Sequence, residues 1–465
     1  MPFLGTTGGG SVKQYGGQAN LGYFIKNSLR FRASAGGYLN RTFSSGDQQK
    51  FTLSLWVKRG NSSTNRIFTC GSSGSSYFQF RFDSDDKILI SSENPSLLLN
   101  LGTSQLFRDY SAWYHLVLAI DTTQATASNR VRLYVNGTEI TSFSSSTYPS
   151  PNTNLLVNSN IAHYIGELSY ALTNGYDGYM AEINFIGGQQ LTPSSFGKTD
   201  NGTGQWVPKK FAGTYGTNGF YLKFADASAA TAAAIGKDSS GNGNNWTPNN
   251  ISVTSGATYD AMIDVPTLTN ATTANYCVLN TLDGTNMGYI TVSNANLTYS
   301  EAASANGWRA IRGTIGVTSG KYRFSVYGSI GFSSRMQLGL CTSATDLGSY
   351  NVSQNIGVQY NPYDGNAVVN GSATSYGSTQ RITAVFDFIF DASTGKCWVA
   401  VNGTLLGGNP DAGTGEMATF TTTSPVFPVT QAYGSSWDVN FGQRPWDYTI
   451  ATASGFKSLN TFNLP

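Results

Sequence analysis

Phe51-Thr52-Leu53-Ser54-Leu55-Trp56-Val57 is the stretch of sequence that decides the fold class. Apolar and small polar residues alternate along it, and a period of two places successive side chains on opposite faces of a β-strand. The segment from Trp113 to Ile120 is almost entirely apolar and ends at the turn-forming residues Asp121-Thr122-Thr123, which predicts a central strand. Together the two segments predict a β-sheet with a buried face.

Two segments with a shared pattern predict β-hairpins in distant parts of the chain. Arg132 to Val135 leads into Asn136-Gly137 and then Thr138-Glu139-Ile140, and Lys396 to Val401 leads into Asn402-Gly403 and then Thr404-Leu405-Leu406. Asn-Gly is the dipeptide that best fits the positive φ angles of a type I′ turn. One such hairpin in each half of the chain favours two separate β-sandwiches.

The composition supports an all-β chain and excludes several classes of protein. Of 465 residues, 53 are Gly, which with many Ser, Thr and Asn suits short strands joined by tight turns. Charged residues make up 12% and the net charge is +2, so we expect no nucleic acid as a partner. Hydrophobic residues make up 40%, too many for a disordered chain. No apolar run approaches the roughly 20 residues of a membrane helix, so we expect no membrane insertion.

Changes in composition divide the chain into four parts. The Gly-rich residues 1–28 show little apolar periodicity and predict an N-terminal attachment arm. Residues 29–200 and 266–465 predict two antiparallel jelly-roll β-sandwiches. Residues 201–265 are assigned to a connector, with the alternative that they complete the first sandwich. Within them, the Ala-rich stretch 226–235 is the one segment that predicts a helix, of one or two turns.

The order of segments in the first sandwich resembles a known family. The segments are Phe51 to Lys58, Trp113 to Asp121, Arg132 to Gly137, Tyr164-Ile165-Gly166 and Gly178 to Ile183, and they are similar to strands of laminin-G-like, concanavalin A-like jelly rolls. The stretch Asp238 to Trp246 resembles an Asp-Ser-Ser-Gly-Asn-Gly-Asn run of that superfamily. The resemblance implies a concanavalin A-like first domain.

The second half of the chain resembles the SPRY (B30.2) sandwich in Gly320 to Val326, in Phe386 to Gly403 and in Val439 to Pro445. A laminin-G-like sandwich, a connector and a SPRY-like sandwich form an arrangement that is similar to tailed-bacteriophage virion proteins. This resemblance implies a tail fibre, tail or capsid-decoration component on the virion surface, assembled in the host cytoplasm. It also implies other virion proteins as partners and self-association as a trimer.

The acidic residues, histidines and cysteines form no pattern of an active site. Glycoside hydrolases with a concanavalin A-like jelly roll carry Glu-x-Asp-x-Glu or Glu-x-Asp-x-x-Glu on one strand, whereas the six Glu residues here are isolated. His115 and His163 have no hydrolase motif beside them, so we interpret both as structural residues. The four cysteines lack a Cys-x-x-Cys pair and predict buried free thiols. We therefore expect a protein that is not an enzyme.

Asp238, Ser240 and Asn242 are the candidate ligands of a metal. Alternate oxygen side chains followed by Gly243 imitate the start of an EF-hand calcium loop, but the twelfth position is Asn249 instead of a bidentate Glu. An Asx-rich turn is the interpretation that we prefer. We expect no cofactor, with calcium as the alternative.

Tyrosines in Gly-, Ser- and Asn-rich turns are the candidate ligand-binding residues, because aromatic faces stack on sugar rings and loops often carry binding sites. These candidates are Tyr148, Tyr170, Tyr176, Tyr350, Tyr360, Tyr363 and Tyr376. The predicted function is adhesion of a non-enzymatic virion surface protein to a host-surface glycan or protein. A capsid or tail decoration protein without a host ligand is the alternative, and a glycan-cleaving tail protein is the third hypothesis.

Overall fold

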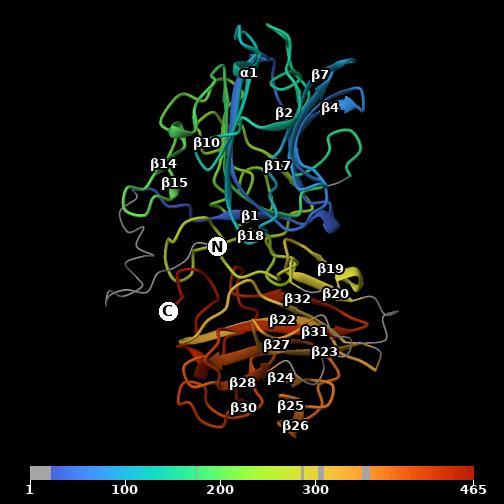
Figure 1. Ribbon diagram of the computed structural model, residues 1–465, viewed down its shortest axis with the longest axis vertical. Helices are drawn as coiled ribbons and strands as arrows, with labels where there is room; N and C mark the ends of the chain where they lie inside the picture. Colours follow the sequence, from blue (N-terminus) through green and yellow to red (C-terminus); the bar gives the residue numbers. More distant parts are fainter. Residues whose placement is uncertain (1–21, 174, 284–286, 302–307, 333, 348–356) are drawn as a thin grey trace.

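The computed structural model describes residues 22–173, 175–283, 287–301, 308–332, 334–347 and 357–465, which form two antiparallel β-sandwiches (Figure 1). The predicted all-β architecture is confirmed. The helical segments of the described residues are short: α1 (Ala127–Arg130) and the 3-10 turns η2 (Ala33–Ala35), η3 (Pro193–Ser195), η4 (Met287–Tyr289) and η7 (Ala451–Ala453). Among these described parts, no helix is long and apolar enough to cross a membrane.

Two eight-stranded sheets form the first sandwich. One contains β1 (Ser28–Phe31), β3 (Lys50–Arg59), β8 (Tyr114–Asp121), β9 (Val131–Val135), β10 (Thr138–Glu139), β13 (Gly178–Gly187), β16 (Phe220–Leu222) and β18 (Ala261–Met262). The other contains β2 (Tyr38–Thr42), β4 (Asn65–Ser73), β5 (Ser76–Phe82), β6 (Ile88–Glu93), β7 (Leu97–Thr103), β11 (Phe143–Thr147), β12 (Ala162–Ile165) and β17 (Thr247–Asn249). Their orders are β10-β9-β8-β3-β13-β1-β18, with β16 beside β13, and β11-β7-β6-β5-β4-β12-β2-β17. A small ribbon of β14 (Gly197–Thr199) and β15 (Trp206–Pro208) lies beside them (Figure 1).

The second sandwich pairs an eight-stranded and a six-stranded sheet. The larger sheet contains β19 (Ile290–Ser293), β20 (Thr298–Glu301), β22 (Lys321–Ser329), β27 (Thr383–Asp391), β28 (Lys396–Val401), β29 (Thr404–Leu405), β30 (Ala418–Thr419) and β32 (Ser436–Asn440). The smaller one contains β21 (Arg309–Arg312), β23 (Arg335–Thr342), β24 (Val358–Asn361), β25 (Asn366–Val369), β26 (Ser372–Ser375) and β31 (Val426–Tyr433). Their orders are β19-β20-β32-β22-β27-β28-β29, with β30 beside β28, and β21-β31-β23-β24-β25-β26.

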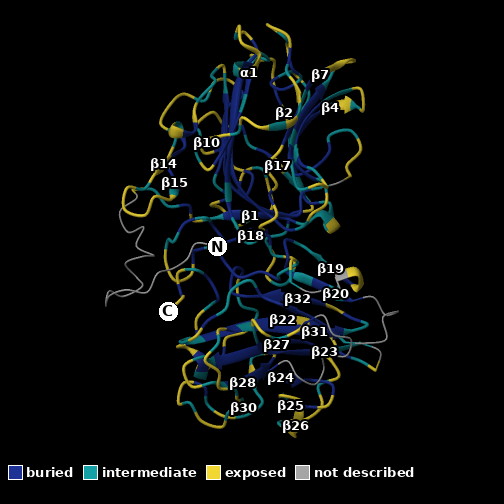
Figure 2. Cartoon of the chain, viewed as in Figure 1, coloured by how far each residue is buried: buried dark blue, intermediate teal, exposed yellow. Residues whose placement is uncertain are grey.

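Strand β3 shows why the sequence pattern predicts the core. Its apolar side chains Phe51, Leu53 and Leu55 lie in the core of the first sandwich. The opposite face is buried as well, because later segments cover it: the Thr52 hydroxyl donates to the Gln189 carbonyl oxygen over 2.7 Å, and Ser54 contacts His115. Figure 2 shows the same pattern across both sandwiches, with buried residues along the strands and exposed ones mainly in loops.

Both Asn-Gly turns form as predicted. In the β9–β10 turn Asn136 has φ 48° and Gly137 has φ 83°, and in the β28–β29 turn Asn402 has φ 47° and Gly403 has φ 80°. These positive angles are those that a type I′ turn requires. Each Asn side chain also accepts a hydrogen bond from a backbone N–H of the neighbouring strand, of His115 and Val385 respectively.

Residues 201–265 extend the first sandwich. Strand β16 pairs with β13, β17 pairs with β2, and β18 pairs with β1. The helix predicted for 226–235 is wrong, since this stretch forms turns closed by bonds such as Ala234 N–H to the Thr231 carbonyl oxygen, 3.2 Å. Forming the first turn of a helix is unfavourable in free energy, and a helix of one or two turns gains too few hydrogen bonds to offset it. The turns that form instead bury Ile235 in the core.

The apolar core of the second sandwich continues into its interface with the first sandwich. Trp56, Trp113 and Tyr179 of the first sandwich belong to the same buried cluster as Tyr276 and Phe324 of the second. Polar contacts accompany the apolar ones, for example the 3.2 Å hydrogen bond from the Tyr179 hydroxyl to the Ala295 carbonyl oxygen. The sandwiches therefore pack as one body.

The last residues assigned to the N-terminal arm are part of this packing. Ile25 is 1% exposed, and its carbonyl oxygen accepts a 2.9 Å hydrogen bond from the Thr267 hydroxyl. The boundary predicted at residue 28 is therefore too late, because residues 23–28 are already fixed by the fold. The rest of the predicted arm, residues 1–21, lies outside the described residues.

Candidate functional site

An open groove of about 640 Å³ lies on the first sandwich, beside the outer face of the sheet that contains β13 and β16. Its lining comes from two segments of the connector. These residues are Lys210, Phe211, Ala212, Gly213, Thr214, Tyr215, Gly216, Thr217 and Tyr221, together with Ser239, Ser240 and Asn242. The volume falls within the range of sites that bind small molecules.

Aromatic rings line one wall of the groove in a continuous row. The Phe211 ring stacks on Phe196 at 5.2 Å, Tyr215 meets Phe211 edge to face at 5.0 Å, and Tyr215 lies parallel to Tyr221 at 6.5 Å. Phe211 and Tyr215 are half-buried, so part of each ring stays accessible. A 3.0 Å hydrogen bond from the Tyr215 hydroxyl to Asn184 Oδ1 fixes that ring.

The turn that carries the candidate metal ligands also lines the groove. Asp238 Oδ1 accepts 2.8 Å hydrogen bonds from the N–H groups of Tyr221 and Ser240, and Oδ2 accepts from the Ser240 hydroxyl and from Asn244 N–H, also at 2.8 Å. Both carboxylate oxygens thus organise an Asx-type turn, and Asn242 donates to the Gly216 and Gly219 carbonyl oxygens. No group of three or more His, Cys, Asp or Glu that could hold a metal occurs among the described residues.

A buried carboxyl lies behind Tyr221. Glu182 Oε2 accepts hydrogen bonds of 2.5 Å from the hydroxyls of Tyr221 and Tyr23. Glu182 has φ 52°, at an irregularity in the pairing of β13 with β3, and this unusual backbone turns the side chain toward the tyrosines. Burial raises the pKa of the Glu182 carboxyl, although both tyrosine hydroxyls favour its charged form.

The groove offers several kinds of group that a ligand can contact. The groove presents ring faces, hydroxyls, amide groups and the Lys210 ammonium group. Glu182 and Asp238 both contact Tyr221. Both oxygens of Asp238 and Oε2 of Glu182 accept hydrogen bonds within the protein. Glycoside hydrolysis would need two carboxyls facing the sugar bond from the cavity.

The predicted tyrosines are spread over both sandwiches and do not form one site. Tyr176 and Tyr360 are 0% exposed, so the assignment of these two to ligand-binding loops is wrong. Tyr176 follows its loop into the core and donates to the Lys58 carbonyl oxygen, and Tyr360 lies in β24. Tyr350 is outside the described residues.

The remaining candidate tyrosines are partly accessible to solvent. Tyr148 and Tyr170 are half-buried in the first sandwich, whereas Tyr363 and Tyr376 lie in the second, with Tyr363 8% exposed. Tyr215, which sequence reasoning missed, lies in the Gly- and Thr-rich loop 213–217, and the Gly content of that loop was the available signal.

Both histidines are structural, as their sequence context indicates. The Trp206 indole N–H donates to His115 Nδ1 over 2.9 Å, which leaves Nε2–H to donate to Ser54. His163 Nε2 accepts from Asn158 N–H, and its ring stacks on Phe43 at 3.8 Å. Burial lowers the pKa of each imidazole to about 3. The four cysteines are buried and free, as predicted.

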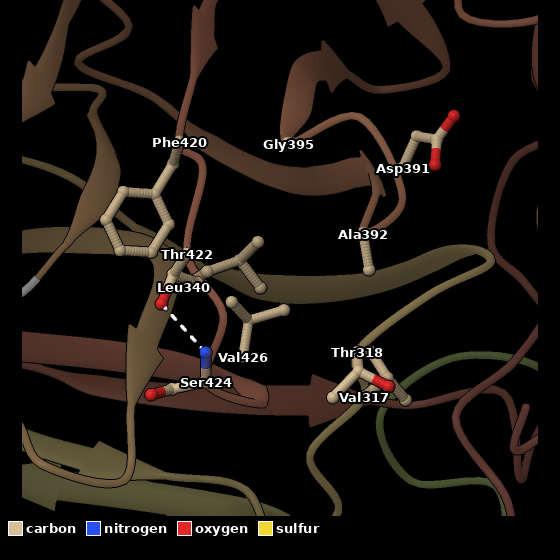
Figure 3. A pocket seen from close by; sticks show the side chains of 10 residues that line it. All are labelled: Val317, Thr318, Leu340, Asp391, Ala392, Gly395, Phe420, Thr422, Ser424 and Val426. Carbon is tan, nitrogen blue, oxygen red and sulfur yellow. Dashed lines mark hydrogen bonds between the residues drawn. The ribbon is translucent and has the colours of Figure 1, made fainter.

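The second sandwich contains a pocket of about 10 Å³ between Val317, Leu340, Ala392 and Phe420 (Figure 3). The Ser424 N–H closes one side by donating to the Thr422 hydroxyl over 3.1 Å. This volume holds about one water molecule, so the pocket is not a ligand site.

Comparison with known proteins finds a family model that matches part of the chain. Residues 33–195 match the concanavalin A-like lectin/glucanases superfamily. No curated protein matches the chain.

Several solved structures are similar to parts of the chain. The SPRY domain of human HERC1 is 16% identical, with a TM-score of 0.27 over 32% of this chain and 91% of that one. A proposed carbohydrate binding protein from Bacteroides ovatus is 15% identical, with a TM-score of 0.35 over 49% and 59%. Domain 4 of the arabinanase AbnA from Geobacillus stearothermophilus, solved with arabinotriose, is 20% identical, with a TM-score of 0.25 over 32% and 65%. The family match places a concanavalin A-like domain in the first of two β-sandwiches.

Proposed function

We propose that the protein binds a saccharide in the groove between the Phe211–Tyr215 wall and the 239–242 turn. The observation that carries this proposal is one open groove that combines accessible aromatic rings with hydroxyl and amide groups. Sugar rings stack their apolar faces on aromatic side chains, while polar side chains bond the hydroxyls. The match of the same sandwich to a superfamily of lectins and glucanases supports this chemistry.

The biological setting that we propose is adhesion at the surface of a phage virion. The support is the resemblance of the domain order, a laminin-G-like sandwich before a SPRY-like one, to virion proteins. The N-terminal part would attach the protein to the particle, and the groove would bind a host-surface glycan. The proposed role involves no catalysis, cofactor or metal.

A glycan array probed with the full chain tests the binding proposal, and calorimetry with the best ligand then localises it. Tyr215→Ala removes a stacking face, so affinity should fall roughly tenfold or more, a difference of about 1.4 kcal/mol. Tyr259→Ala is the matched control, because it removes another half-buried loop tyrosine of the same sandwich that is not part of the groove lining. Equal affinities of both variants and the wild type would place the ligand elsewhere.

Two further measurements test where the protein lies on a phage particle and whether it cleaves glycans. Immunogold labelling of purified phage particles should mark tail fibres or tail tips if the protein is an adhesin, whereas label over the head would favour the decoration role. Release of reducing sugar from host polysaccharide should stay at the level of a buffer control. Sustained release by the wild type would contradict a purely binding role.

A further inference from the structure

We propose a second binding site, in the second sandwich, for the carboxylate groups of an acidic saccharide. It consists of Phe332, Arg335, Tyr363 and Arg381, which we call the arginine stack. Phe332 and Arg335 lie at the connection from β22 to β23, Tyr363 follows β24, and Arg381 precedes β27. The stack shares no residue with the groove, so this inference does not depend on the proposed function.

The four side chains pack against one another, and the Phe332 and Tyr363 rings meet edge to face at 6.1 Å. The guanidinium carbon of Arg381 lies 4.9 Å from the ring centre of Phe332 and 4.1 Å from that of Tyr363. The guanidinium carbon of Arg335 lies 4.2 Å from the centre of the same Tyr363 ring. Nε of Arg335 and of Arg381 also donate 3.4 Å hydrogen bonds, to the carbonyl oxygens of Phe332 and Tyr363. These contacts hold both guanidinium groups in fixed orientations.

The two positive charges of the stack have no neutralising carboxylate. All Asp and Glu residues of the chain lie in the described residues, and no ion pair there includes Arg335 or Arg381. Asp364, the acidic residue next to Tyr363, accepts a 2.9 Å hydrogen bond from Asn361 instead. Because both cations contact one ring, they repel each other, and an anionic ligand would relieve this repulsion.

The stack is open to a ligand. Phe332 is 75% exposed and the adjacent Ile382 is 44% exposed. A Cβ atom added at Gly331 would meet no atom within 4 Å, so space is free beside the Phe332 backbone. The Phe332 ring can cover the apolar face of a sugar ring, while guanidinium N–H edges pair with a carboxylate through two parallel hydrogen bonds.

The strands around the stack favour a saccharide over an extended acidic peptide. Strand β22 lies between β27 and β32, β23 lies between β24 and β31, and β24 lies between β23 and β25. Extended peptides commonly bind by adding a strand to a free sheet edge. On the side of β24, the free edge of the smaller sheet is β26, and with four residues it is too short to pair with much of a peptide. A chain of uronic acid residues instead brings repeated carboxylates to the fixed guanidinium groups.

Calorimetry with the full chain and trigalacturonate tests the inference. We expect measurable binding that weakens as salt rises, and loss of binding for the methyl-esterified trisaccharide, which keeps the rings but not the charges. Arg381→Gln should weaken binding roughly fivefold or more, and Arg335→Lys, which keeps the charge but loses the planar fork, should also weaken it. Arg108→Gln is the control, since its side chain is 63% exposed in the first sandwich.

Each alternative result is decisive. Absence of trigalacturonate binding, or affinity unchanged in Arg381→Gln, would overturn the proposal. Equal binding of the ester would show that charge plays no part and would overturn it too. A blocked glutamate-rich peptide that binds the stack while trigalacturonate does not would replace the saccharide with a protein partner. Tyr215→Ala should leave trigalacturonate binding intact, which separates this test from that of the groove.

Discussion

Replacing Asp264 with Asn should destabilise the protein strongly, because it breaks a fully buried ion pair of the first sandwich, beside its interface with the second. Lys58 Nζ donates to Asp264 Oδ2 over 2.9 Å, and both side chains are 0% exposed. The same ammonium group also donates to Asn275 Oδ1 and to the Tyr276 carbonyl oxygen, at 2.8 and 3.0 Å. Trp113 donates to the other carboxylate oxygen.

The size of the effect follows from what remains in the variant. Removing one partner of a buried pair commonly costs about 3–5 kcal/mol, because the other charge stays buried without compensation. Lys58 would keep two neutral acceptors, so we expect a loss near the lower limit, about 3 kcal/mol in the free energy of unfolding. That is a large part of the roughly 5–15 kcal/mol that stabilises a typical domain.

Urea unfolding followed by tryptophan fluorescence measures this loss. Asp85→Asn is the control with the same change of charge, and since the Asp85 side chain is 55% exposed it should cost under about 1 kcal/mol. The double replacement Lys58→Met with Asp264→Leu should recover most of the stability, because no unpaired charge stays buried. A cost of Asp264→Asn no larger than that of Asp85→Asn would refute the reasoning.

Three further predictions concern stability. Arg66 Nε and Nη1 are buried without a hydrogen-bond partner, so Arg66→Met removes two unsatisfied polar groups. The free energy of unfolding in urea titrations should rise by about 2 kcal/mol. A loss of stability would contradict this. Burial lowers the pKa of His163 to about 3 in the folded protein, whereas an unfolded histidine takes up its proton near pH 6.5. Below about pH 6.5 the wild type should therefore lose up to roughly 1.4 kcal/mol of stability per pH unit more than His163→Gln. Parallel plots of stability against pH for the two proteins would contradict this. Gly137→Ala should cost roughly 1–3 kcal/mol in thermal unfolding, because φ is +83° and the new Cβ would lie 2.4 Å from the Trp206 ring; an unchanged melting temperature would contradict this.

Local chemistry explains the features that sequence predicts well. The Asn136-Gly137 and Asn402-Gly403 turns form because positive φ angles are favourable for those residues wherever the flanking strands lie. The alternating stretch 51–57 predicts a core strand because its period fixes the faces of the sheet. Both features depend on residues that are neighbours in the chain.

The candidate site could not be predicted in the same way. The groove forms where 210–217 meets 239–242, and these segments are brought together by the bond from Tyr221 N–H to Asp238 Oδ1. Nothing in the local sequence indicates that contact. Burial is equally nonlocal: Tyr176 lies in a Gly-rich loop like that of Tyr215, yet its side chain turns into the core.

The interface between the sandwiches bears on both proposed sites. Asp177 Oδ1 accepts a 2.5 Å hydrogen bond from Ala295 N–H, and the Tyr179 hydroxyl donates to the carbonyl oxygen of the same residue. Apolar contacts alone are non-directional, whereas these bonds, and those from the Lys58 ammonium group to Asn275 and Tyr276, form in one relative orientation only. The groove and the arginine stack are therefore held at a constant separation. A glycan long enough to span both sites would bind the second one at high effective concentration, and a shorter one would gain nothing from the second site.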